Sequence, residues 1–353
     1  MHFPIIFGLS AALPLIVASP VQFPLPDGFP NPSADQVVAI QQKAGGSLPG
    51  GPLPASLQPN GVTALKLIAL NEIFEVAYFT SLLYNITHEV AGYGPDVYKP
   101  VLKQFLVDTF TAVVNQEELH AVATNAALKN AGQTQIQPCK FQFPVTDFDA
   151  AIALAATFTD VVFATVPQAQ AIFTADGGDE SGLVPLFSSV IGQEGEQNGV
   201  YRSLQKKVPS SAPFLTGGAP DFAFTALQGF ILPNSCPQPL SDIPLKTFGK
   251  LDVVSTPEAK NSTIEFAVPA GPSIDVSANA IVYLSGQNLP LTVPISDITY
   301  ANGEAHFKAA FPFEAGFAKG LTIAALVKGT GNFKTAGEVV KVAVNGPGLI
   351  EVG

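Results

Sequence analysis

Apolar residues recur at steps of three and four positions over four stretches of the chain, which is the spacing of a helix with one buried face. These stretches cover residues 62–88, 95–130, 146–173 and 182–207. Helices of similar length that each carry one apolar face can pack side by side around a shared core. The pattern therefore predicts a four-helix bundle over residues 61–208.

The last third of the chain has a different pattern. From residue 245 onward, short runs of β-branched residues alternate with turn residues such as Asn302-Gly303. This alternation is typical of antiparallel strands, so we expect a small β-sandwich over residues 245–353. Two proline-rich segments flank the bundle: an arm with little regular structure at 20–60, and a connector at 209–244.

Polar residues interrupt the apolar face near the middle of each predicted helix. In chain order these residues are Glu72, Glu75, Glu117, His120, Thr159, Glu194 and Gln197. If the helices pack side by side, the interruptions meet at one depth inside the bundle. A buried carboxylate without a partner costs several kcal/mol, so such a cluster needs metal ions, protons or hydrogen bonds.

The connection between the second and third helices is long enough to cross the whole bundle. Residues 131–145 span about 45 Å when extended, whereas the predicted helices are about 40 Å long. The other connections between the helices are short.

Four segments carry a resemblance to a known family: LNEIFEVAYF, NQEELHAVATNAALKNAG, FPVTDFDAAIALAATFTDVV and IGQEGEQNGVYRSL. The sequence resembles the ferritin-like family of plant desiccation-related proteins and of fungal late-sexual-development and stress-response proteins. Di-metal bundles of the ferritin type use one Glu on each of two helices, Glu-x-x-His on each of the other two, and a long crossover. The resemblance implies that Glu72, Glu117 and His120 are metal ligands.

Two ligand positions of that pattern are substituted. Thr159, with Asp160 beside it, stands at the Glu position of the third helix. On the fourth helix Glu194 is kept, but Gln197 stands where the family has His. Because Thr159 cannot bridge two ions and Gln197 is a weak donor, the remaining residues, including Glu75, are expected to hold one divalent ion (Fe, Mn or Zn) or to form a proton-sharing cluster. Glu75 is either a ligand or a neighbour of the ligands.

Composition limits the classes of partner. The 17 basic and 28 acidic residues give a net charge of -11, which disfavours nucleic acid and anionic membrane surfaces. Residues 1–19 resemble a secretory signal peptide that is cut near Ser19, and no later stretch looks like a membrane span. We therefore expect a secreted protein.

The cysteines and sequons fit an extracellular location. Cys139 and Cys236 are the only two cysteines and are expected to form a disulfide in an oxidising compartment. Asn85 and Asn261 begin N-glycosylation sequons, and Asn261 lies between predicted strands.

Three functions remain open at this point. The first is a secreted, non-catalytic ferritin-like protein of fungal sexual development or stress response, with a degenerate metal site. The second is a di-metal oxidase or ferroxidase that uses Asp160 and Gln197 as unusual ligands. The third is a protein of the cell wall or extracellular matrix whose β domain binds carbohydrate, with Tyr283 and Tyr300 as the aromatic candidates.

No nucleophile motif or phosphate-binding loop is present, which argues against a hydrolase or nucleotide enzyme. The sequence leaves the oligomeric state open.

Overall fold

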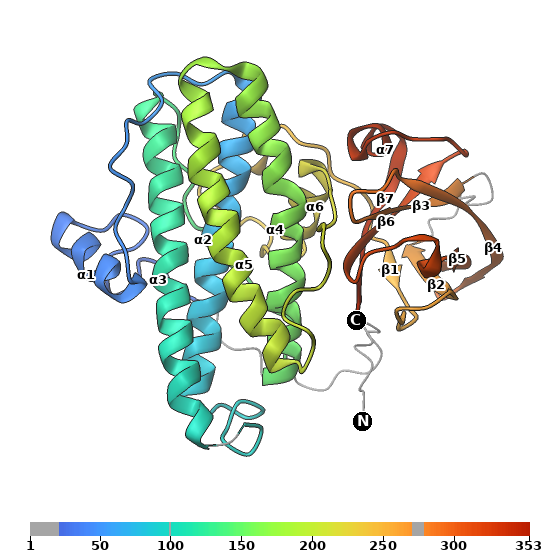
Figure 1. The fold of residues 1–353 in the computed structure, drawn as a ribbon, viewed down its shortest axis with the longest axis horizontal. Helices are drawn as coiled ribbons and strands as arrows, with labels where there is room; N and C mark the ends of the chain where they lie inside the picture. The colour runs from blue at the N-terminus through green and yellow to red at the C-terminus, as the bar shows by residue number, and fades with distance from the viewer. Residues whose placement is uncertain (1–20, 99, 270–278) are drawn as a thin grey trace.

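The computed structural model describes residues 21–98, 100–269 and 279–353, so the predicted signal peptide at 1–19 lies outside the described residues. Four long helices form a bundle, and a β domain packs against one side of it (Figure 1). The predicted fold class, a ferritin-like helical bundle followed by an antiparallel β domain, is confirmed. The bundle helices are α2 (Pro59–Thr87), α3 (Pro100–Asn130), α4 (Phe148–Asp176) and α5 (Leu183–Leu204), with the short 3-10 helix η1 (Gly178–Gly182) between the last two.

Local sequence signals set the starts of the helices. Asp147 caps α4, because its Oδ1 accepts a hydrogen bond from the backbone N of Ala150 at 2.9 Å. Pro59 occupies the first turn of α2, where its missing N–H costs nothing. The buried carboxylate of Glu180 accepts a hydrogen bond from Gln58 N at that end of α2, where it faces the positive pole of the helix dipole.

The arm at 20–60 contains one helix that its composition does not predict. Helix α1 (Ala34–Ala44) begins at a capping box formed by Ser33 and Gln36. Its buried residues Ile40 and Ala44 pack against Leu119 of α3. The capping box and this apolar contact stabilise a helix in a segment that is otherwise rich in proline and glycine.

The β domain is one strongly folded antiparallel sheet. Its strand order is β1-β2-β5-β4-β3-β6-β7, and a register shift in β4 between Ser296 and Thr299 lets the sheet bend. A bridge between Gly249 and Asn345 brings the two ends of the sheet together, so it forms a nearly closed barrel. The strands are β1 (Asp252–Val253), β2 (Ser262–Pro269), β3 (Asn279–Ser285), β4 (Leu291–Ala301), β5 (Glu304–Phe311), β6 (Gly320–Lys328) and β7 (Ala343–Val352).

Aromatic side chains fill the inside of this barrel. Phe266 stacks on Phe307 with ring centroids 5.9 Å apart, and Tyr283 meets the edge of Phe311 at 5.6 Å. Tyr283 is only 1% exposed, so it cannot stack on a sugar, whereas Tyr300 is 56% exposed. The two tyrosines therefore do not form one carbohydrate platform.

The outer face of the barrel packs against the bundle. Val282 and Ile323 of this face lie in one apolar cluster with Val161 of α4 and Phe222 of α6 (Pro220–Gln228). The connector runs between the two domains and bonds to both, since Gly218 N donates to Ala164 O at 2.8 Å while the neighbouring Gly217 N donates to Gly286 O at 3.0 Å. The remaining short helices are η2 (Leu240–Asp242), η3 (Phe313–Ala315) and α7 (Ala336–Val342).

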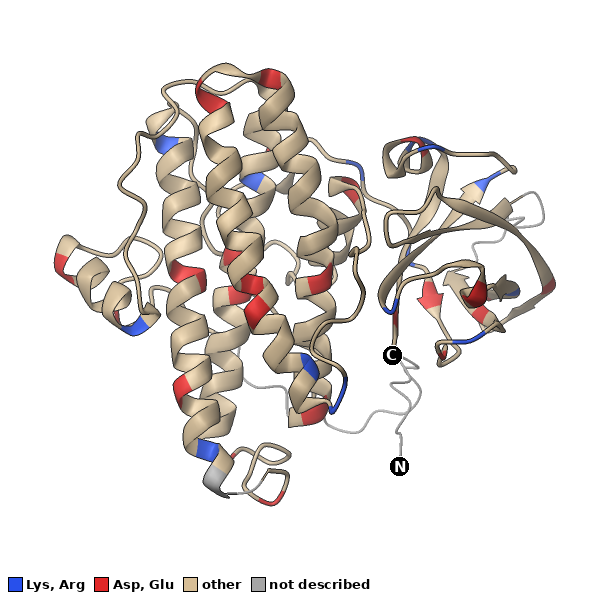
Figure 2. Ribbon diagram, in the orientation of Figure 1, with Lys and Arg blue, Asp and Glu red and all other residues tan. Residues whose placement is uncertain are grey.

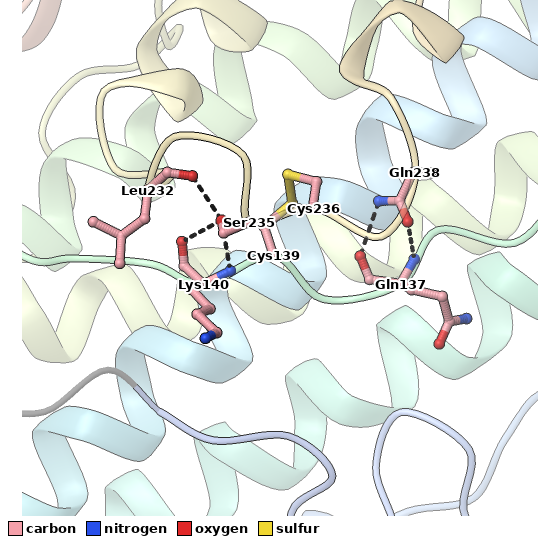
Figure 3. Close-up of a disulfide and its surroundings, with 7 residues drawn as sticks. All are labelled: Gln137, Cys139, Lys140, Leu232, Ser235, Cys236 and Gln238. Carbon is pink, nitrogen blue, oxygen red and sulfur yellow. Dashed lines mark hydrogen bonds between the residues drawn. A yellow bond between two sulfur atoms is a disulfide. The ribbon is translucent and has the colours of Figure 1, made fainter.

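The predicted disulfide between Cys139 and Cys236 is present (Figure 3). It joins the crossover after α3 to the connector after α6. The hydroxyl of Ser235 accepts from Lys140 N at 3.1 Å, and Gln238 Nε2 donates to Gln137 O at 2.9 Å. The crossover is therefore fixed to the connector covalently and by hydrogen bonds.

Among the described residues, one helix is long and apolar enough to match a membrane span. This helix is α4, and 72% of its most apolar window is buried inside the protein. Its apolar surface is used in the bundle core, so it gives no clear membrane span.

Candidate metal centre

Three helices of the bundle bring four potential ligands together. Glu72 lies on α2, Glu117 and His120 on α3, and Glu194 on α5, and one ligand atom from each lies within 4.8 Å of all the others. Acidic residues gather at mid-height of the bundle, as expected from the polar interruptions in the helix faces (Figure 2). Four of the residues that interrupt the apolar helix faces thus lie together inside the bundle.

His120 stands at the centre of the contacts. Its Nδ1 lies 2.9 Å from Glu117 Oε2, 3.4 Å from Glu72 Oε2 and 4.0 Å from Glu194 Oε1. The first distance is a hydrogen bond, and the other two are ion-pair contacts. One imidazole therefore faces three carboxyl groups from three helices.

The carboxyl groups are buried beyond the reach of solvent. Glu72, Glu117 and Glu194 are each at most 1% exposed. Both oxygens of Glu72 and both oxygens of Glu194 are without a hydrogen-bond donor among the described residues. Because an uncompensated buried carboxylate is costly, these four oxygens require a cation or a proton.

Electrostatics divide the carboxyl groups into two kinds. Burial raises the pKa of Glu72 to about 7, and burial together with the charges of Glu72 and Glu117 raises the pKa of Glu194 well above its ordinary value. Burial also opposes ionisation of Glu117, but the charge and hydrogen bond of His120 outweigh it and lower the pKa of Glu117. Burial disfavours the charged imidazole, yet Glu117 and Glu72 raise the pKa of His120 well above 6.5. In the absence of a cation, the cluster thus favours one ion pair surrounded by protonated carboxyl groups.

Glu75 lies next to this cluster but outside the set of four mutually close ligand atoms. Its Oε1 accepts a hydrogen bond from Asn71 Nδ2 at 3.3 Å. Burial, followed by the charges of Glu194 and Glu117, raises the pKa of Glu75 well above its ordinary value. This geometry favours Glu75 as a neighbour of the ligands.

Gln197 donates to a ligand. Its Nε2 donates to Glu117 Oε1 at 2.6 Å, while its Oε1 accepts from Tyr201 OH at 3.1 Å. The side chain that replaces the family's His therefore positions Glu117. Tyr201 and Gln116, which also bonds to Gln197 Nε2 at 3.2 Å, complete this network. Sequence reasoning assigned neither a role, although Tyr201 lies four positions after Gln197 on the same helix face.

Helix α4 contributes no ligand to the cluster. Thr159 is buried, and its hydroxyl has no hydrogen-bond partner among the described residues. Asp160 accepts from Asn198 Nδ2 at 2.9 Å and lies beside Glu351 of the barrel. The hypothesis that Asp160 is an unusual metal ligand is therefore wrong, because successive residues of a helix point about 100° apart.

A small apolar cavity adjoins the cluster. It lies between α2, α4 and α6, and it has about 20 Å³ of space for water-sized molecules. Leu67, Val162, Ala223 and Leu227 form part of its wall, and Glu72 belongs both to this wall and to the ligand cluster. A volume of this size holds about one water-sized molecule beside Glu72.

The four clustered donors, three carboxyl groups and one imidazole, suit one metal ion. The two-metal pattern of ferritin-type bundles has a second Glu-x-x-His and a Glu on the remaining helix. Here Gln197 donates a hydrogen bond to Glu117, and Asp160 accepts one from Asn198.

Comparison with known proteins identifies the helical part of the chain. No curated protein matches the chain. Residues 62–207 match the model of the ferritin-like domain family, and they span the four helices that carry or surround the cluster. The helical part of this chain is therefore a ferritin-like domain, whose buried carboxylate and histidine cluster could hold a metal ion.

Proposed function

We propose that this protein binds one divalent metal ion through Glu72, Glu117, His120 and Glu194 and that it does not catalyse an oxidation. The observation that carries the proposal is the convergence of four ligand atoms within 4.8 Å, where the oxygens of Glu72 and Glu194 receive no hydrogen bond from the part of the chain that the structure describes. A cation would neutralise these carboxylates and replace the protons that the cluster otherwise needs. Three oxygen ligands and one imidazole suit Fe, Mn or Zn.

The same proposal places the protein outside the cell, among the ferritin-like proteins of fungal sexual development and stress response that its sequence resembles. Residues 1–19 have the pattern of a signal peptide, and a disulfide between Cys139 and Cys236 is typical of oxidising compartments. Asn261 is exposed and suits a glycan. Asn85 is 6% exposed within α2, so the folded helix has no room for one.

The test compares two glutamates of the same helix. Glu194 is buried in the cluster, whereas Glu196 is exposed. After incubation with Fe(II), Mn(II) or Zn(II) and removal of excess ion, elemental analysis should give about one equivalent for the wild type and for Glu196→Ala. Glu194→Ala should retain less than about a tenth of an equivalent, because one of four ligands is lost.

An oxygen electrode completes this test. We expect no oxygen consumption above the buffer rate when Fe(II) is added to the wild type. Two equivalents of iron together with oxygen consumption that Glu194→Ala abolishes would contradict the proposal.

Binding of two equivalents of iron together with oxygen consumption would instead support the alternative function, a di-metal oxidase. One observation favours this alternative. The cavity beside Glu72 provides an apolar space for a small neutral molecule next to the ligands. Ala223→Leu, which fills this cavity from α6, would then slow the oxidation while leaving the iron content unchanged.

A further inference from the structure

The contact between the two domains contains a buried pair of carboxyl groups. Asp160 of α4 is 3% exposed, and Glu351 lies near the end of β7. The two side chains are close enough to hydrogen-bond to each other. Neither Asp160 Oδ2 nor Glu351 Oε1 receives a hydrogen bond from a donor among the described residues. Two carboxyl groups bond to each other only when at least one carries a proton.

The polar and charged groups around this pair come from α5 and the residues that follow it. Asn198 of α5 donates to Asp160 Oδ1 at 2.9 Å. Arg202, which is 3% exposed, and Lys207 supply the positive charges that face the pair. Arg202 is itself held in place, because its Nε donates to Val208 O at 2.8 Å.

Backbone geometry allows this close approach. Gly320, at the start of β6, has a φ of +87°, and a Cβ there would lie 3.0 Å from Ser211 Oγ and 3.7 Å from Asp160 Oδ2. A side chain at this position would be strained and would crowd the pair. The glycine therefore lets the barrel lie close to Asp160.

We propose that Asp160 and Glu351 share a proton across the domain contact and that this shared proton is an acid-dependent latch holding the barrel on the helical bundle. In acid, the proton joins α4 to the last strand of the chain. In alkali, its loss leaves two carboxylates facing each other, with the charges of Arg202 and Lys207 beside them. The latch thus loosens as the pH rises.

The direction of titration agrees with this geometry. Burial raises the pKa of Asp160 to about 6, and burial together with the charge of Asp160 raises the pKa of Glu351 well above its ordinary value. In the docked state the barrel lies on the helical bundle. A carboxyl group whose pKa is raised in this state stabilises the contact fully when the pH is below the ordinary pKa of the group. This stabilisation is lost as the pH rises from the ordinary pKa to the raised pKa of the docked state. The relevant pH window therefore begins near the ordinary pKa values of the two carboxyl groups, about 4, and extends up to their raised values in the docked state.

Titration of Lys207 favours the docked state as the pH rises, which opposes the effect of the two carboxyl groups. Burial lowers the pKa of this amine below 10.5, so its uncharged form is favoured in the docked state as the pH rises. The Lys207→Met variant removes this contribution and should leave in place the loosening of the latch as the pH rises.

The experiment measures local opening of the domain contact in the full-length protein. Amide hydrogen exchange of β7 and α4 is followed between pH 5 and pH 8 and corrected for the intrinsic pH dependence of exchange. If opening releases one proton, the opening equilibrium constant of the wild type should rise by up to about tenfold for each pH unit from pH 5 upward, until the pH reaches the raised pKa of the pair. The Glu351→Gln variant keeps the shape of the side chain and supplies an amide donor that does not titrate. The opening equilibrium of the domain contact in this variant should therefore not change between pH 5 and pH 8.

Control variants separate the latch from general charge effects. Glu258→Gln changes a side chain of the β domain that is 68% exposed, and it should behave like the wild type. Asp160→Asn tests the other side of the pair and should reduce the pH dependence, because the charge of Asp160 then no longer raises the pKa of Glu351. The proposal is overturned if wild-type β7 is equally protected at pH 5 and pH 8, a result that requires no variant to fold. It is also overturned if Glu351→Gln keeps the wild-type pH profile.

Discussion

Gln197 donates a hydrogen bond to Glu117 at 2.6 Å, so a side chain at a metal-ligand position of the ferritin-like pattern serves to hold another ligand. The other oxygen of Glu117 faces His120 Nδ1 at 2.9 Å. Both oxygens of this carboxylate are thereby oriented, whereas those of Glu72 and Glu194 are not. The site has one fixed carboxylate–imidazole pair and two carboxyl groups that lack donors.

The first prediction concerns Gln197 as a positioning residue. Gln197→Met keeps the length of the side chain but removes the hydrogen bond to Glu117. Metal affinity should fall by about 10- to 100-fold, the usual effect of losing a hydrogen bond to a ligand. Isothermal titration with Mn(II) or Zn(II) measures this change. Gln193→Met is the control, because Gln193 bonds to Gln116 and not to a carboxylate; equal losses in both variants would contradict the assigned role.

A second prediction concerns the cost of burying Glu194. Its pKa is raised in the folded protein, so its contribution to stability is lost as the pH rises above its ordinary value. In the presence of a chelator, Glu194→Gln should therefore be more stable than the wild type at pH 7, by an amount on the order of 1–3 kcal/mol. The difference should disappear near pH 4, where the wild-type carboxyl group is protonated in both states. Urea unfolding at the two pH values measures it, and a variant less stable than the wild type at pH 7 would refute the idea.

Metal binding should stabilise the fold. A metal at about 100 times its Kd adds about 2.7 kcal/mol to the free energy of unfolding. The melting temperature should rise when Mn(II) or Zn(II) is added and return on chelation. Glu72→Ala should show no such rise, while Glu196→Ala should keep it. A rise of equal size in Glu72→Ala would place the metal elsewhere.

The disulfide should contribute substantially to stability. Its cysteines are 97 positions apart, and closing a loop of about this length stabilises a protein by about 4.7 kcal/mol in the chain-entropy account. Replacing both Cys139 and Cys236 by Ser should lower the free energy of unfolding by up to this amount. Chemical denaturation of the oxidised wild type, the reduced wild type and the double variant tests this, and equal stability of all three would contradict it.

The sequence by itself determined the helical bundle, the antiparallel β domain, the disulfide and the four clustered ligands. The periodicity of apolar residues identifies the inner face of each helix, and it therefore also identifies the polar residues on that face. Glu72, Glu117, His120 and Glu194 followed from this rule because their helices are long and strongly patterned. The capping box of α1 was also present in the sequence, but the proline-rich composition around it obscured the helix.

Only the tertiary structure decided what each polar residue faces. A helical pattern gives the direction of a side chain within its own helix, but the neighbour at the same depth depends on how helices and domains pack. For this reason the sequence could not show that Gln197 turns its amide toward Glu117, or that Glu75 stands beside the ligand set. Nor could it show that Asp160, one residue after Thr159, meets Glu351 from a strand that follows it by almost two hundred residues. Contacts between distant segments create the surroundings of a buried carboxyl group, and those surroundings decide whether it holds a metal, a hydrogen bond or a proton.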